Sequence, residues 1–146
     1  MVQSGQGSKW APRMLVLFGL GMIAAGIFTA YPALGFPIGT PLENNPVNWH
    51  SMLHLISGMI GFAGFIATCF IFARRFRALR QKRLAYYSLV TGIFFLAAFV
   101  GIASGSKGPV SAIFLVAVAA GFAWITMISA RLKRGLAMSP DSQRRA

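Results

Sequence analysis

The chain has very few acidic residues and little charge of any kind. Only Glu43 and Asp141 are acidic among its 146 residues, and charged residues make up 11% of the total. Soluble domains carry about 25% charged residues. With 56% hydrophobic residues and a mean hydropathy of +0.66, a water-soluble globule could not cover its apolar surface. The composition therefore indicates a protein whose solvent is lipid.

Cysteine is equally scarce. The single cysteine, Cys69, excludes an internal disulfide bond. It lies within a long apolar run, so we interpret it as a small buried hydrophobic residue.

Long apolar runs are what the sequence has in abundance. A helix needs about 20 apolar residues to cross the hydrocarbon core of a bilayer, and the lack of strand-like alternation argues against a barrel. The alternative of a cleaved signal peptide for the first run is weakened by its length and by Pro32 at the cleavage region. We predict an all-α fold, a single membrane domain forming a four-transmembrane-helix bundle, with helices at residues 14–31, 52–73, 84–103 and 109–130.

Basic residues show how these helices are oriented. Lys and Arg fall before the first helix, in the connection 74–83 and in the tail 131–146, whereas the outer loop 32–51 has none and the last short loop has only Lys107. The positive-inside rule then places both termini in the cytoplasm. Glu43 and Asp141 lie on opposite sides, which excludes a mechanism using paired carboxylates.

The net charge of +12 raises the question of nucleic-acid binding. The basic residues stand at the ends of apolar runs and do not form a groove-lining face, so we expect no nucleic-acid partner. Anionic lipid headgroups at the cytoplasmic face are the expected contact.

Small residues recur at a spacing of four within three of the predicted helices. The pairs are Ser57/Gly61, Ala97/Gly101 and Ala117/Gly121. Such pairs let helix backbones approach closely. We interpret them as packing sites within the bundle, and a homo-oligomer interface is the alternative.

Four stretches of the sequence are informative: WAPRMLVLFGLGMIAAGIFTAYPALGFPIGTP from Trp10, WHSMLHLISGMIGF from Trp49, CFIFARRF from Cys69 and GIASGS from Gly101. They resemble a bacterial membrane family called domain of unknown function 998, and this resemblance implies that the chain lies in the inner membrane of a bacterium. Members are typically six-helix proteins of unknown activity, so the resemblance implies that this chain corresponds to their last four helices, as a truncated homologue or one with a misassigned start. The family's Asp-Pro after the corresponding helix is replaced here by Tyr31-Pro32.

The two histidines are the main candidates for chemistry. His50 and His54 are four residues apart at the outer end of the second helix and share one face. The resemblance implies a related pattern, His-Gly-x-x-His. Zinc needs three or four ligands, and only Glu43 in the outer loop could complete a set of three. A metal site at His50, His54 and Glu43, for zinc or another divalent ion, is therefore one hypothesis.

The alternative for these histidines is structural, with His50 capping the helix or lining the interface and His54 bonding a neighbouring helix. The sequence predicts a multi-pass membrane protein of unassigned biochemical function that needs no cofactor. The second functional hypothesis is a membrane enzyme or a ligand-binding or metal-binding protein with an outer-face site around the histidines. Whether the protein is an enzyme stays open at this point.

Overall fold

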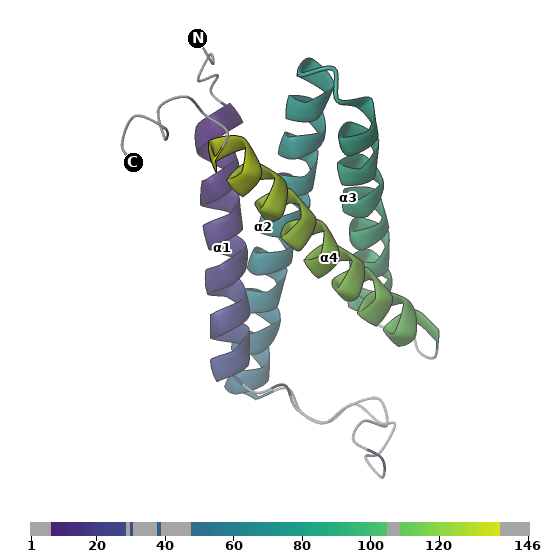
Figure 1. The fold of residues 1–146 in the computed structure, drawn as a ribbon. Helices are drawn as coiled ribbons and strands as arrows, with labels where there is room; N and C mark the ends of the chain where they lie inside the picture. Colours follow the sequence, from purple (N-terminus) through teal and green to yellow (C-terminus); the bar gives the residue numbers. More distant parts are fainter. Residues whose placement is uncertain (1–6, 29, 31–37, 39–47, 105–108, 138–146) are drawn as a thin grey trace.

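Four helices make up the described part of the computed structural model (Figure 1), which covers residues 7–28, 30, 38, 48–104 and 109–137. They are α1 (Gly7–Ile27), α2 (Trp49–Ala78), α3 (Lys82–Ala103) and α4 (Pro109–Ala137). All four are long and apolar enough to cross a membrane. The prediction of an all-α, four-helix membrane protein is confirmed.

The helix ends differ from the predicted ranges because hydropathy measures the apolar run and not the helix. α1 begins at Gly7 and ends at Ile27, before the predicted end at Tyr31. The largest differences lie where basic residues flank an apolar run, at the start of α1 and at the ends of α2 and α4. Arg and Lys are good helix formers, so the helix extends beyond the apolar residues.

The predicted basic loop 74–83 is therefore mostly helical. α2 runs to Ala78 and α3 starts at Lys82, which leaves only Leu79–Gln81 as a turn. The predicted outer loop 32–51 is also too long at its end, because His50 and Ser51 belong to the first turn of α2. Residues 32–37 and 39–47 of that loop lie outside the described residues.

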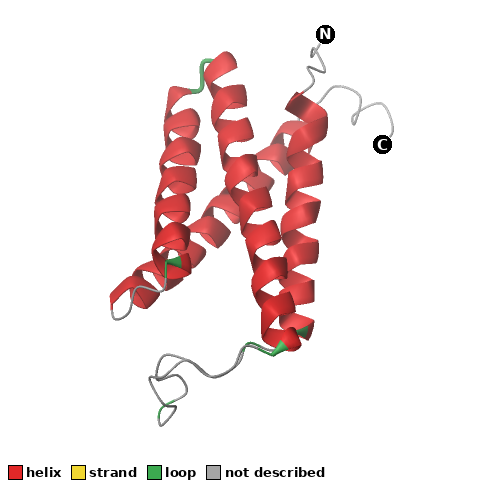
Figure 2. Ribbon diagram, turned by 180° about the vertical axis from the view of Figure 1, so that it is seen from behind, coloured by secondary structure: helices red, strands yellow, loops and turns green. Residues whose placement is uncertain are grey.

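Helices α1, α2 and α3 run alongside one another, and α4 crosses them at an angle (Figures 1 and 2). The start of α1, the α2–α3 turn and the end of α4 lie at one end of the molecule. Every Lys and Arg of the described residues lies in these three places, so we name this the basic end. The opposite end carries the end of α1 and the start of α2.

Helices α1 and α2 pack through glycine. A Cβ atom added to Gly21 would lie 2.6 Å from the Cα of Gly61 and 2.8 Å from the carbonyl oxygen of Ser57. A Cβ on Gly64 would lie 2.8 Å from the carbonyl oxygen of Met14. Such approaches are shorter than carbon atoms tolerate, so the two backbones meet directly. The Ser57/Gly61 pair thus serves packing within the chain.

Aromatic side chains join α4 to the other helices. The ring of Trp124 is 1% exposed and packs against Phe65 and Phe72 of α2, with centroids 5.8 and 5.7 Å away. Its Nε1–H donates a hydrogen bond of 3.0 Å to Oγ of buried Ser88 on α3. This bond satisfies the indole in an otherwise apolar core. Cys69, fully buried in the same core, is the small hydrophobic residue that the sequence indicates.

Candidate functional site

An open groove lies between α2 and α3 at the basic end. Its volume is about 790 Å³, within the range of roughly 300–1,000 Å³ that is typical of small-molecule sites. We call it the basic groove, and its lining comprises Phe70, Ala73, Arg74, Arg77, Arg80, Lys82, Ala85, Tyr86 and Leu89.

The groove is built from one stripe of each helix. On α2 the stripe is Phe70, Ala73, Arg74 and Arg77, and on α3 it is Lys82, Ala85, Tyr86 and Leu89. Both follow the spacing i, i+3, i+4, i+7, which places four side chains on one helix face. The cations, Arg74 and Arg77 on α2 and Lys82 on α3, lie nearest the turn, and the largely apolar residues lie deeper along each helix. The groove therefore has a cationic mouth and an apolar floor.

The turn at the mouth of the groove holds Arg80 in an unusual conformation. Its φ is 58°, the left-handed region, where a non-glycine residue costs roughly 1–2 kcal/mol. The N–H of Arg80 donates to the carbonyl of Arg77 and that of Gln81 donates to the carbonyl of Phe76. These two bonds form a Schellman motif, whose left-handed position is usually glycine. The chain thus has a cation at a position where glycine would have a lower conformational free energy.

Negative charge is missing around these cations. Glu43 and Asp141 are the two acids of the chain, and both lie outside the described residues. Arg74, Arg77 and the other cations of the mouth therefore have no carboxylate partner in the described part of the chain. The side chain of Gln81 also makes no capping bond at the start of α3. As far as the described residues go, the positive charge of the basic groove is accordingly uncompensated.

The histidines lie at the opposite end of the helices. Nδ1 of His54 lies 2.7 Å from the carbonyl oxygen of Ala25 and 2.8 Å from that of Phe28. The last carbonyls of a helix lack intrahelical partners, so His54 satisfies the end of α1. Because a carbonyl only accepts, Nδ1 carries the hydrogen that these two bonds need. Bonding of His54 to a neighbouring helix, the structural alternative, is what the geometry shows.

His50 contacts aromatic rings rather than main-chain groups. Its ring centroid lies 3.7 Å from that of Trp49 and 6.1 Å from that of Phe28. The cap of α2 is supplied by Asn48, whose side chain accepts from the N–H of Ser51 at 2.8 Å. The expectation that His50 caps the helix is therefore wrong, because Asn48 already occupies that role.

The predicted metal site stays a prediction. Glu43, its third ligand, lies outside the described residues, as does Tyr31 of the departure from the family pattern. Within the ranges that the structure describes, no three His, Cys, Asp or Glu side chains come together. The arrangement of His54 is compatible with metal binding, since an Nδ1–H bonded to a carbonyl leaves Nε2 as the ligand atom.

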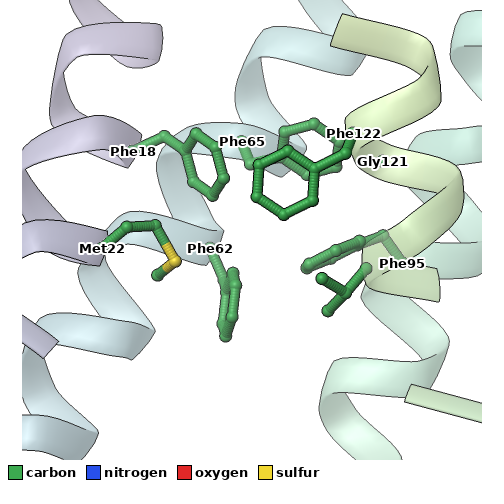
Figure 3. A pocket seen from close by; sticks show the side chains of 8 residues that line it. Phe18, Met22, Phe62, Phe65, Phe95, Gly121 and Phe122 are labelled. Carbon is green, nitrogen blue, oxygen red and sulfur yellow. The ribbon is translucent and has the colours of Figure 1, made fainter. Parts of the chain in front are cut away.

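A second, smaller cavity lies between all four helices (Figure 3). Its volume is about 50 Å³, too small for a drug-sized ligand. The lining is wholly apolar and consists of Phe18, Met22, Phe62, Phe65, Phe95, Val118, Gly121 and Phe122. Without a polar group it can neither orient a ligand nor carry chemistry, so we assign it to packing.

The sequence shows the basic residues of the groove but not their arrangement. It predicts a loop for residues 74–83, and without a helix their side chains could not be assigned to one face. The signal that could have found the groove is the i, i+3, i+4, i+7 spacing from Phe70 to Arg77, repeated from Lys82 to Leu89.

Comparison with known proteins adds one finding. A search of the curated proteins and of the solved structures finds no match to the chain. Residues 1–131 match the model of a family described as "Protein of unknown function (DUF998)". This match covers most of the 146 residues and agrees with the resemblance seen in the sequence. The chain is a multi-pass membrane protein and belongs to the DUF998 family.

Proposed function

We propose that this protein lies in the bacterial cytoplasmic membrane and binds the anionic headgroup of a phospholipid in the cytoplasmic leaflet through its basic groove. The observation that carries the proposal is the groove itself, with four cationic side chains above an apolar floor. A phospholipid has the matching form, a charged headgroup on an apolar chain. Cytoplasmic leaflets are rich in anionic lipids, and clusters of Lys and Arg next to a membrane helix are attracted to them.

The orientation rests on the basic end. Lys and Arg of the described residues gather at the start of α1, around the α2–α3 turn and at the end of α4. The positive-inside rule assigns that end to the cytoplasm. The groove mouth then lies at the level of the headgroups, and Phe70 and Leu89 lie at the level of the acyl chains. This placement can be tested with a reporter that is active only outside the cytoplasm: fusion after Asn45 should be active and fusion after Gln81 silent, and activity after Gln81 would contradict the orientation.

Lipid binding is tested by two double variants of equal charge. Arg74→Gln with Arg77→Gln removes two cations that line the groove, whereas Arg75→Gln with Arg83→Gln removes two neighbouring cations that do not line it. The full chain is purified in a neutral detergent, which removes the attraction of a charged membrane surface. A titration with a short-chain anionic phospholipid then measures the affinity of each variant.

We expect the groove variant to bind at least about ten-fold more weakly than the parent. Each hydrogen bond to a charged group contributes roughly 1.5–3 kcal/mol, and about 1.4 kcal/mol corresponds to a ten-fold change in affinity. The control variant should bind nearly as well as the parent. Equal weakening of both variants would show a general effect of charge and would reject the groove as the site.

A further inference from the structure

We infer that the basic groove selects a lipid whose headgroup is a phosphate monoester over one whose phosphate is a diester. This inference rests on the proposed function, because it names the class of lipid that the same groove takes. A monoester carries about −1.5 to −2 charges at pH 7, since its second pKa is about 6. A diester carries a single negative charge and has one phosphate oxygen fewer to accept hydrogen bonds from cations.

The charge of the groove favours the more highly charged ligand. Arg74, Arg77, Arg80 and Lys82 all line the mouth, and the described residues contain no carboxylate to neutralise them. One negative charge leaves most of this positive charge uncompensated. A second negative charge on the same phosphate is attracted by all four cations at once. Arginine adds specificity, because its planar guanidinium can bind two phosphate oxygens together.

Main-chain groups at the turn are not available to replace these side chains. The N–H groups of Leu79, Arg80 and Gln81 all donate to carbonyls at the end of α2. Within Leu79–Gln81, recognition of the phosphate must therefore come from side chains. Arg80 points most strongly to such a role, because the chain holds it at a φ of 58°. An arginine adopts this conformation only at a cost in conformational free energy.

A lipid is favoured over a soluble phosphate by the apolar half of the groove. Phe70 and Ala73 of α2 and Ala85 and Leu89 of α3 line this half. Their side chains carry no polar atom, and Tyr86 adds only one hydroxyl group to hold a sugar or a base. An acyl chain can cover such an apolar surface. A soluble monoester has the same phosphate but would leave the floor empty, so we expect it to bind much more weakly than the lipid.

The test compares three probes on the full chain in neutral detergent at pH 7.5 and pH 5.5. The probes are dioctanoyl phosphatidic acid, a monoester lipid; dioctanoyl phosphatidylglycerol, a diester lipid; and glycerol 3-phosphate, a soluble monoester. Isothermal titration calorimetry gives the dissociation constants. The side chains that line the groove include neither a histidine nor a carboxylate. A change of affinity between the two pH values therefore reports the second ionisation of the ligand.

We expect the monoester lipid to bind about ten-fold more tightly than the diester lipid at pH 7.5, because each of several exposed charge pairs contributes a few tenths of a kcal/mol or more. This preference should shrink severalfold at pH 5.5, where the monoester carries little more than one charge. Both the preference and its pH dependence should be lost in the Arg74→Gln, Arg77→Gln variant. The Arg75→Gln, Arg83→Gln variant should keep both.

Three results would overturn these conclusions in distinguishable ways. Equal binding of the two lipids, with both weakened by the groove substitutions, would reject the monoester preference and leave the proposed function standing. Binding of both lipids that the groove substitutions do not weaken would reject the proposed function as well. Binding of glycerol 3-phosphate as tight as that of the monoester lipid would reject a lipid as the source of the phosphate.

Discussion

Replacing Arg80 separates what the turn needs for folding from what the groove needs for binding. The residue sits at a φ of 58° in the Schellman motif that ends α2. Glycine adopts this conformation without the cost of roughly 1–2 kcal/mol that other residues pay. Its greater freedom in the unfolded chain offsets about 0.4–1 kcal/mol of that gain. Arg80→Gly should therefore stabilise the fold by about 0.5–1 kcal/mol.

Arg80→Ala is the matched control for this prediction. It removes the same guanidinium as Arg80→Gly but keeps a Cβ, and hence the cost of the left-handed conformation. Both variants should lose the same lipid affinity, and only the glycine variant should be more stable than the parent. Stability is measured by equilibrium denaturation in bicelles, and affinity by titration with phosphatidic acid. Equal stability of the two variants would mean that the turn does not hold Arg80 in the left-handed region.

Three further predictions concern packing and the opposite end of the helices. Gly21→Ala places a Cβ 2.6 Å from a main-chain atom of α2 and should destabilise the fold by about 1–3 kcal/mol. The control Gly19→Ala meets nothing within 4 Å and should leave the stability unchanged. Equal effects of the two substitutions in a denaturation assay would contradict this packing. His54→Ala should cost about 0.6 kcal/mol, the average for such bonds in a membrane bundle, and a loss near zero would show that α1 does not need this partner. Zinc should leave the melting temperature of the parent unchanged. If zinc raises it, and if the rise is lost in each of three variants, the metal site is established. The three variants are His50→Ala, His54→Ala and Glu43→Ala.

The membrane helices could be predicted from the sequence because lipid imposes a simple rule. An apolar run of about 20 residues must form a helix in the bilayer, where no water can satisfy its backbone. That rule does not apply beyond the hydrocarbon core. The residues from Arg74 to Ala78 are helical, although their hydropathy resembles that of a loop.

The sites could be predicted only in part. The sequence shows that an intramembrane histidine needs a partner, but it does not show that the partners of His54 are the carbonyls of Ala25 and Phe28. The groove depends on the tight turn between α2 and α3, and that turn has Arg80 where the usual sequence signal is glycine. Without the turn, the stripes of α2 and α3 could not line one groove.

Photo-crosslinking in bacterial membranes tests the central claim, that the basic groove holds an anionic lipid. Tyr86 lines the groove, and its neighbour Tyr87 does not, so a photoreactive phenylalanine analogue is placed at each position in turn. Mass spectrometry of the irradiated protein identifies the attached lipids. We expect adducts at position 86 to be enriched in anionic phospholipids relative to the membrane, and adducts at position 87 to match its bulk composition. The same bulk composition at both positions would contradict the claim.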